Sequence, residues 1–451
     1  MSQGNTITSG FIDLATFDEI EKYMYGGADA TAYFVRETRK STWFTQVPVT
    51  LSRAAGPPNF GQECSWSISR AGDYLLQSWL RVTVPSVELQ STGGTVQQIR
   101  WTRNFMHNLV RECSITFNDL VAARFDNYHL DIWAAFTVPS GKQNAYANMI
   151  GSFSGLTDPQ TVLESHTLNL PLPFFYGRDS GVALPTAALP YNDMRLNFSF
   201  RSWEDLLIGV NTTVPGQRVS VTASDLKVAP ELKTVQLWSN YAIVSNEERK
   251  MMACAPRDIL IEQVQTAPRQ PFLNNGNNHP NFDIRFSHAI KCVFFGTRNK
   301  TWPSEWSQYA THSPTVGQNG TMYHLPSGAG DPIEKTSLIY ENTQRLSGMG
   351  SDYFSLVNPF FHAPVIPKET GLHSYSYSLD FMQLDPMGST NYGKLTNVSI
   401  LPEPSETAKS ASAGTLQEAG ADVAQKYEFI VTAVNNNIIR ISGGALGFPV
   451  L

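Results

Sequence analysis

The segment MRLNFSF, Met194–Phe200, alternates apolar and polar side chains without interruption. The apolar set is Met194, Leu196, Phe198 and Phe200, and the polar set is Arg195, Asn197 and Ser199. This period of two residues is typical of a β-strand that has one face in a hydrophobic core and the other face in water. A strand with a single buried face indicates an antiparallel sheet, because parallel strands are usually buried on both faces.

The same period recurs along most of the chain from about Thr42 onward. It is present in CSWSIS from Cys64, in ECSITF from Glu112, in YSYSLDF from Tyr375 and in KYEFIVTAV from Lys426. Turns rich in Gly, Pro and Asn separate these short segments. Short strands with turns of this composition indicate antiparallel β-sandwiches, and they do not fit alternating strands and helices around a parallel sheet.

The chain length favours two such sandwiches. A chain of 451 residues exceeds the size of one ordinary core, and a faint match between FMHNL at Phe105 and FSHAI at Phe286 places two histidines 181 residues apart. The segment from Gly209 to Lys233 is polar and carries NTTVPGQR. We therefore predict a first sandwich at 28–212, a linker at 213–232 and a second sandwich at 233–451.

The first 27 residues have a different pattern. In TFDEIEKYMYGG, Thr16 and Glu19 have the spacing of a capping box, and Gly26 with Gly27 supplies a stop. Apolar side chains recur at helical spacing and share one face, namely Leu14, Phe17, Ile20 and Met24. We predict a short amphipathic helical arm at 1–27, which packs either on its own domain or on a partner.

Composition narrows the function. Charged residues make up only 16% of the chain, against about 25% in typical soluble domains, and the centres of protein interfaces are depleted in charge. The net charge is −6 and basic residues do not cluster, which argues against direct binding of nucleic acid. No stretch approaches the 18 apolar residues of a transmembrane helix. The four cysteines lack the spacing of zinc ligands or of a disulfide framework.

One segment resembles a phosphate-binding loop. In MGSTNYGKLT, Met387–Thr396, the positions of Gly388, Gly393 and Lys394 match the motif, but Leu395 stands where the hydroxyl that holds Mg²⁺ belongs. Strand-like sequence lies on both sides, whereas a phosphate loop needs a helix after it. We interpret the segment as a connection between strands, and we expect no cofactor and no metal.

Catalytic patterns are sparse. The chain has no H-E-x-x-H motif, and GSFSG places Phe153 where a nucleophilic serine would stand. Glu112, Asp119, Asp283 and Asp380 could pair in three dimensions, as in a glycosidase on a jelly roll, but nothing selects two of them. A duplicated carbohydrate-binding sandwich is the other alternative. Its candidate outer-loop aromatics, in WPSEWSQY, are Trp302, Trp306 and Tyr309. We predict that the protein is not an enzyme.

Longer stretches carry a resemblance that covers essentially the whole chain. LPLPFFYGRDSGVALPTAALPYNDMRLNF from Leu170, DPMGSTNYGKLTN from Asp385, and the N-terminal TSGFIDLATFDEIEKYMYGG resemble the major capsid proteins of iridoviruses. FMHNLVRECSITFNDLVAARFD from Phe105 and the C-terminal NNNIIRISGGALGFPVL are similar to the same family. Within it, the chain most resembles the proteins of invertebrate iridescent viruses.

The resemblance implies an all-β double jelly roll, which is two tandem eight-stranded antiparallel β-sandwiches, with a short N-terminal helical arm and long surface loops. It further implies a homotrimer that forms a pseudo-hexagonal capsomer and tiles the icosahedral shell of a large DNA virus over an internal membrane. Such a protein belongs to the virion capsid and is assembled in the host cytoplasm.

The same resemblance implies partners both within the shell and on its inner side. They are other capsomers and the minor capsid, penton and membrane proteins of the virion, with no direct contact to nucleic acid and no transmembrane segment. The arm residues expected at this inner contact are Phe11, Leu14, Phe17, Ile20 and Met24.

Overall fold

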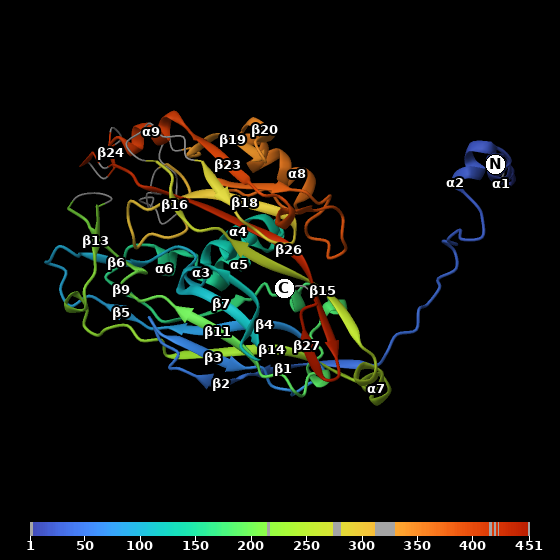
Figure 1. Cartoon of the computed structure of the whole chain (residues 1–451), viewed down its shortest axis with the longest axis horizontal. Coiled ribbons are helices and arrows are strands. Elements are labelled where there is room, and N and C mark those ends of the chain that lie inside the picture. Colours follow the sequence, from blue (N-terminus) through green and yellow to red (C-terminus); the bar gives the residue numbers. More distant parts are fainter. Residues whose placement is uncertain are drawn as a thin grey trace. The chain divides into compact units, whose positions relative to one another are not determined.

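The computed structural model describes residues 3–213, 217–273, 281–311, 330–414, 417–418, 421–422 and 424–449. The chain divides into two units, Met1–Trp43 and Phe44–Leu451, and each is described by itself. The larger unit contains two β-sandwiches that lie next to each other, with the first drawn mainly in blue to green and the second in yellow to red (Figure 1).

The first sandwich contains eight principal strands. They are β1 (Phe44–Thr50), β3 (Glu63–Ser67), β4 (Tyr74–Val84), β7 (Val110–Phe117), β8 (Leu120–Asp126), β10 (His166–Pro171), β11 (Met194–Phe200) and β14 (Thr234–Val244). Numbered one to eight along the chain, they form two antiparallel sheets with the orders 1-8-3-6 and 2-7-4-5. The alternating segment predicted from the sequence is β11, where Leu196 is buried between Trp66 and Ile115 on the neighbouring strands.

The second sandwich repeats this arrangement. Its strands are β15 (Arg257–Thr266), β17 (Phe282–Ile284), β18 (Ala289–Asn299), β19 (Ile333–Tyr340), β20 (Thr343–Gly350), β21 (Leu372–Ser376), β23 (Val398–Pro404) and β26 (Tyr427–Ser442). The sheet orders are again 1-8-3-6 and 2-7-4-5. The prediction of a double jelly roll is therefore confirmed, although the strand predicted at 375–381 ends at Ser376.

Short strands either pair with strands of these sheets or form small separate sheets. They are β2 (Ser52–Ala55), β5 (Val87–Glu88), β6 (Gln98–Trp101), β9 (Val162–Leu163), β12 (Leu207–Asn211), β13 (Gln217–Ser220), β16 (Gln270–Pro271), β22 (Thr390–Asn391), β24 (Gln417–Glu418), β25 (Ala421–Asp422) and β27 (Ala445–Gly447). Helix α9 (Glu406–Ser412) packs Ala408 and Ala411 into the core of the second sandwich.

The predicted division between the sandwiches lies too early in the chain. Strand β14 (Thr234–Val244) pairs with β1 and β4, so it completes a sheet of the first sandwich. The polar segment 213–232 is a connection inside that sandwich, where β13 pairs with β12. Polar composition marks a long loop there, but it does not say which sandwich the next strand joins. We place the division at helix α7 (Asn246–Cys254).

The short sequence match between the two halves is also misleading. FMHNL forms helix α3 (Phe105–Leu109) and precedes the fourth strand of the first sandwich. FSHAI precedes and enters β18, which is the third strand of the second sandwich. The two segments therefore occupy different places in the jelly roll, and the true repeat is one of strand order.

Three helices lie between the two sandwiches in Figure 1, namely α3, α4 (Asn127–Thr137) and α5 (Gln143–Ile150). The connection at 137–160 contains α5 and a further short helix, α6 (Ser154–Thr157). On the second sandwich, a π-helical turn η6 (Tyr353–Val357) runs directly into α8 (Asn358–His362).

The unit Met1–Trp43 contains two helices where one was predicted. Helix α1 covers Gln3–Ala15 and α2 covers Glu19–Met24. The capping box is formed by Asp18 and Glu21, whereas the Thr16 hydroxyl donates to the carbonyl of Asp13. The predicted cap at Thr16 is wrong because Asp18 also has the required spacing and accepts from the Glu19 amide. Within the described ranges, no helix has the length and apolarity needed to cross a membrane.

Candidate functional site

A network of buried polar contacts lies where the two sandwiches meet. Helix α4 forms the first side of this junction and follows strand β8 directly, with the Asp126 carboxylate accepting from the His129 amide at 2.9 Å. Helix α4 was not predicted from the sequence, although Tyr128, Ile132 and Phe136 recur at intervals of four residues and are buried. Phe136 contacts Phe294 on β18 with ring centroids 5.3 Å apart, so α4 packs on the second sandwich.

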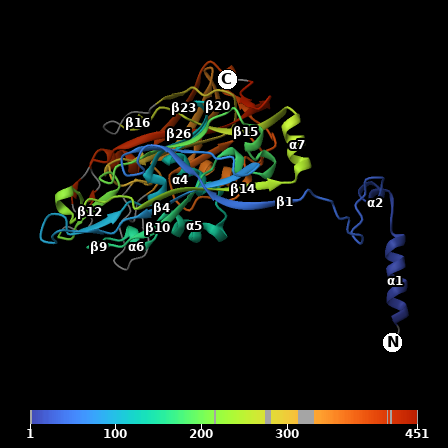
Figure 2. The ribbon, with the colours of Figure 1, turned by 90° about the horizontal axis from the view of Figure 1, so that it is seen from below.

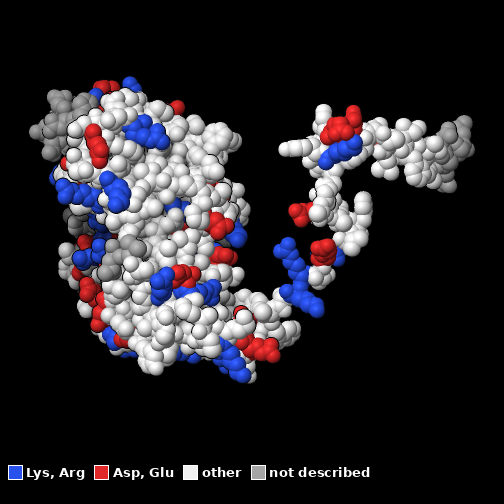
Figure 3. All heavy atoms as spheres, turned by 45° about the vertical axis from the view of Figure 1, so that its right-hand side comes forward, with Lys and Arg blue, Asp and Glu red and all other residues white. Residues whose placement is uncertain are grey.

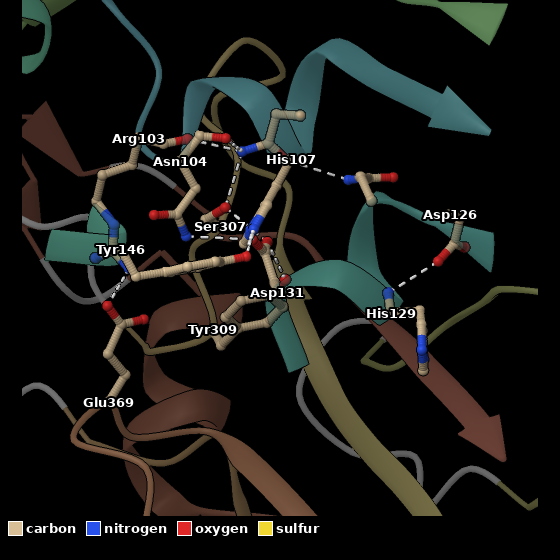
Figure 4. Close-up of polar contacts among 12 residues, drawn as sticks. Arg103, Asn104, His107, Asp126, His129, Asp131, Tyr146, Ser307, Tyr309 and Glu369 are labelled. Carbon is tan, nitrogen blue, oxygen red and sulfur yellow. Dashed lines mark hydrogen bonds and ion pairs between the residues drawn. The ribbon is translucent and has the colours of Figure 1, made fainter. Parts of the chain in front are cut away.

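Asp131 of α4 is the centre of the polar network (Figure 4). Its carboxylate accepts hydrogen bonds from the hydroxyls of Ser307 at 2.6 Å and Tyr309 at 2.8 Å, which both belong to the second sandwich. It also accepts from His107 Nδ1 at 2.7 Å and from the Asn104 amide at 3.2 Å. Two of the four donors, Ser307 and Tyr309, therefore bind the second sandwich to this carboxylate of the first.

These contacts fix the charge state of Asp131. Burial acts to raise the pKa of the Asp131 carboxyl, but the hydrogen bonds from His107, Ser307 and Tyr309 outweigh it and hold this pKa below its ordinary value. His107 Nε2 lies 2.6 Å from the Tyr146 hydroxyl oxygen, so the imidazole bridges Asp131 of α4 and Tyr146 of α5. A cavity of about 530 Å³ adjoins this network, lined partly by α4, α5 and residues 307–310.

A second buried carboxylate at the junction belongs to the second sandwich and is held by two arginines of the first sandwich. Glu305 is buried and forms ion pairs with Arg100 at 3.0 Å and with Arg218. Burial favours the neutral acid, but the two guanidinium groups keep the pKa of Glu305 below its ordinary value. A buried ion pair adds little net stability, yet losing one partner leaves a costly unpaired charge, so the contact strongly favours one arrangement of the sandwiches.

A third buried carboxylate at the junction lies on β15 and also pairs with groups from both sandwiches. Glu262 is buried and pairs with Arg178 of the first sandwich at 2.9 Å and with Lys291 of β18. The Arg178 guanidinium also lies 4.5 Å from the ring centroid of Trp133 on α4. Asp131, Glu262 and Glu305 therefore each join groups from both sandwiches.

Two of the three predicted outer-loop aromatics are buried in this junction. Trp306 is 7% exposed and Tyr309 is 4% exposed, while Trp302 is half-buried. The Trp306 ring lies between the guanidinium groups of Arg201 at 3.6 Å and Arg298 at 3.5 Å, and its indole nitrogen donates to the Asp205 carbonyl at 2.9 Å. The expectation that these side chains stack on sugar rings at the surface is wrong for Trp306 and Tyr309, because the first sandwich covers them.

The five predicted arm residues are all exposed within their own unit. Their exposed fractions are 68% for Phe11, 74% for Leu14, 50% for Phe17, 72% for Ile20 and 63% for Met24. Phe11 and Leu14 belong to α1, Ile20 and Met24 belong to α2, and Phe17 lies between these helices. Since none of them packs into a core, they are available to a partner.

The candidate catalytic carboxylates are divided between the two sandwiches. Glu112 and Asp119 belong to the first sandwich, whereas Asp283 and Asp380 belong to the second. Asp283 accepts from the Ser399 hydroxyl at 2.7 Å, and Asp380 accepts from the Met382 amide at 2.9 Å. Among the described residues, no group of three or more His, Cys, Asp or Glu side chains is placed to hold a metal ion.

The segment that resembles a phosphate loop has the surroundings expected of a strand connection. It contains β22 and a 3₁₀ turn at Tyr392–Lys394, and β23 follows. A 3₁₀ turn of three residues does not present the row of backbone amides that a helix N-terminus offers to phosphate.

Comparison with known proteins decides the family. A model described as "Major capsid protein N-terminus" matches residues 32–244, and one described as "Large eukaryotic DNA virus major capsid protein" matches residues 248–447. The chain is 65% identical to the major capsid protein of Costelytra zealandica iridescent virus, with 100% of both chains covered. The chain belongs to the major capsid proteins of large eukaryotic DNA viruses. It is also 62% identical to the major capsid protein of Invertebrate iridescent virus 6, over 99% of each chain.

Solved capsid structures share the fold. The chain of a quasi-atomic model of the PBCV-1 virus capsid superposes with a TM-score of 0.72 at 20% identity, covering 93% of this chain and 100% of that one. The Faustovirus major capsid protein gives a TM-score of 0.70 at 11% identity, covering 94% of each chain. The family matches give this capsid protein a structural role in the virion, and the junction joins its two jelly rolls.

Proposed function

We propose that three copies of this capsid protein form a pseudo-hexagonal capsomer that tiles an icosahedral shell over an internal membrane. The observation that carries the proposal is the pair of jelly rolls with identical strand orders in one chain. Three chains with two sandwiches each supply six similar blocks, so a three-fold assembly can fill a six-fold position in a lattice.

The junction supports this role because it holds the two blocks in one relative orientation. Asp131, Glu262 and Glu305 are buried and bind groups from both sandwiches, so a hinge motion would break several charge-assisted contacts at once. A lattice needs subunits of constant shape, and a fixed junction provides it. Figure 3 shows wide uncharged areas between the charged side chains of the unit Phe44–Leu451, which suits a surface that other subunits cover.

Light scattering on the purified full chain tests the trimer. The chain mass is 50.0 kDa, so the trimer has a mass of about 150 kDa. A particle of about 150 kDa supports the proposal. A particle of 50 kDa at all concentrations contradicts it and favours the alternative of a duplicated carbohydrate-binding sandwich.

We further propose that the arm at 1–27 faces the inside of the shell, where it contacts minor capsid, penton or membrane proteins during assembly in the host cytoplasm. Its five exposed apolar side chains support this role, since exposed apolar groups at this density usually mark an interaction surface.

Finally, we propose that the protein has no catalytic activity. The separation of the four candidate carboxylates between two sandwiches supports this view. Incubation of the purified protein with a panel of chromogenic glycosides should release no product. Release that disappears in a Glu112→Gln variant would contradict the proposal.

A further inference from the structure

The contact between the two sandwiches of one chain provides a template for the contact between chains. On the second sandwich, the outer face of the 1-8-3-6 sheet is buried, with Phe294 of β18 and with Ile430 and Val434 of β26 in the same hydrophobic cluster as the core of the first sandwich. Helix α4 covers this face through Trp133 and Phe136, which contact Phe294. Because α4 directly follows strand 5 of the first sandwich, an element of fixed position in the jelly roll makes this contact.

The equivalent face of the first sandwich is uncovered within the described part of the unit Phe44–Leu451. Its centre is a stacked pair, Trp79 of β4 and Trp238 of β14, with ring centroids 6.3 Å apart and both side chains half-buried. Strands β1, β14, β4 and β10 carry this surface side by side (Figure 2). We call it the Trp79 face, and its residues are Gln46, Pro48, Thr50, Gln77, Trp79, Arg81, Asn169, Pro171, Gln236, Trp238 and Asn240.

The composition of the Trp79 face is that of a protein interface. Arg81 is its single ionisable residue, and two tryptophans lie at its centre. Interface centres are depleted in charge and enriched in Trp and Arg, which supply much of the binding energy where they occur.

A β-bulge aligns the two faces residue by residue. In β4 the pairing with β14 shifts at Leu76, and in β18 the pairing with β26 shifts at Lys291. Counting three residues beyond each bulge gives Trp79 in the first sandwich and Phe294 in the second. Trp79 therefore occupies the position at which Phe294 receives the aromatic side chains of α4.

The second sandwich also has an equivalent of α4, and its outward apolar side chains are exposed within the described part of the unit Phe44–Leu451. The helical segment 353–362, formed by η6 and α8, follows strand 5 of the second sandwich just as α4 follows strand 5 of the first. Phe354 anchors it in the core at 2% exposure. Its outward side chains are 51% exposed for Leu356, 42% for Val357, 68% for Phe360 and 69% for Phe361.

We propose that the α8 segment of one copy packs on the Trp79 face of the next copy, as α4 packs around Phe294 inside the chain. The contact is heterologous, because two different surfaces meet, and three such contacts close a ring of six sandwiches. This inference rests on the proposed trimer and names the surfaces that hold it together. The internal and the intersubunit contacts then alternate around the capsomer.

The first test replaces the exposed aromatics of α8. A Phe360→Asp/Phe361→Asp variant should fold, because both side chains are exposed, and it should shift the mass in light scattering from about 150 kDa to about 50 kDa. Val228→Asp, at a side chain that is 77% exposed outside both surfaces, is the matched control and should remain a trimer. Circular dichroism confirms the fold of each variant.

The outcomes separate the two proposals. If the unmodified chain is a monomer, the trimer itself is wrong. If the unmodified chain is a trimer and the double aspartate variant is also a trimer, the trimer holds and the α8 contact is wrong, even if shell assembly then fails.

The second test measures which surfaces meet. In a background with the exposed Cys254 changed to Ser, one chain carries Phe360→Cys and another carries Trp79→Cys. A short bismaleimide should link the two chains in a mixture and should link neither chain alone. Cross-linking of the Phe360→Cys chain with itself would show a two-fold contact and would overturn the inference.

Discussion

At the scale of single residues, Trp306 shows how the junction depends on the planar stacking of cations on an aromatic ring. The guanidinium groups of Arg201 and Arg298 lie 3.6 and 3.5 Å from the centroid of the Trp306 ring. Without the ring, these two cations would face each other. Trp306→Ala should therefore lower the free energy of unfolding by about 3 to 5 kcal/mol, measured by urea denaturation. Trp302→Ala, at a half-buried position, is the control and should cost less. Equal losses in both variants would contradict a central role for Trp306.

His129 on α4 gives the junction a dependence on pH. Burial, with a smaller contribution from Arg178, lowers the pKa of His129 from 6.5 to about 3. The unfolded chain therefore binds a proton between pH 6.5 and 3 that the folded chain does not bind, and this group makes the free energy of unfolding fall as the pH falls. The slope is about 1.4 kcal/mol per pH unit within this window.

Replacing the imidazole should remove that slope. We expect His129→Gln to lose less stability than the unmodified chain between pH 6.5 and pH 5, with melting temperature as the measurement. His166→Gln is the control, because His166 is only half-buried and lies outside the junction. The same pH dependence in both variants would assign the effect to other groups.

The burial of a side chain could be predicted from the sequence where it depends only on the alternation within its own strand. Alternation correctly assigned Leu196 and Phe198 to the core, because neighbours in a sheet share its faces. The burial of Trp306 depends on Arg201, about a hundred residues earlier in the chain, and no local pattern reports such a contact. Aromatic residues in a loop look the same in sequence whether another sandwich covers them or solvent does.

At the scale of elements, α4 is the part that joins the sandwiches, and Asp131 is its main polar contact. Asp131→Asn removes the negative charge that accepts hydrogen bonds from four donors. The NH₂ group of the new amide would then face groups that donated to the carboxylate, such as the hydroxyls of Ser307 and Tyr309. The expected loss is about 3 kcal/mol, since hydrogen bonds to charged groups contribute more than neutral ones. Hydrogen exchange should become faster in α4 and at residues 305–309, while β11 stays protected.

A matched variant separates this effect from a general loss of an acid. Asp119→Asn lies in the exposed turn between β7 and β8, where asparagine also tolerates the positive φ of 66°. It should leave hydrogen exchange at the junction unchanged. Faster exchange throughout the first sandwich in Asp131→Asn would mean that the carboxylate supports the whole fold and not the junction in particular.

The five alternating segments named from the sequence all contain strands, whereas most of the connecting elements could not be predicted. Strands have a period that their own residues create, but α4 has a polar N-terminal turn and lies on both cores, so its apolar side chains do not form one clean stripe. The division between sandwiches was misplaced for a related reason. In a jelly roll the last strand pairs with the first strand, so a strand that follows a long polar connection can still belong to the preceding sandwich.

At the scale of the whole molecule, comparing the two sandwiches explains why their equivalent outer faces differ in composition. The two 1-8-3-6 sheets share a bulge and an order of strands, yet one outer face is apolar and buried while the other is polar around two tryptophans. A face that is always covered within the chain can be fully hydrophobic. A face that must stay soluble until a second copy arrives needs amides, threonines and an arginine around its aromatic centre.

The N-terminal arm provides the last prediction, since five of its apolar side chains are exposed in the described part of their own unit. Deletion of residues 1–27 removes α1 and α2 and leaves both sandwiches, with their junction, intact. We expect the shortened chain to form trimers of normal melting temperature, because no core residue is lost. Shell assembly in infected or co-expressing cells should fail, as seen by electron microscopy of the particles.

A chain with Phe11, Leu14 and Ile20 changed to Ser is the matched variant, because it keeps the length of the arm and removes much of its apolar surface. If the arm acts through that surface, this variant should fail in the same way as the deletion. If the deletion fails and the serine variant assembles, the length of the arm is what matters. Intact shells from both would refute the role of the arm, because an apolar contact that is dispensable for assembly cannot be what anchors the capsomer to the inner proteins.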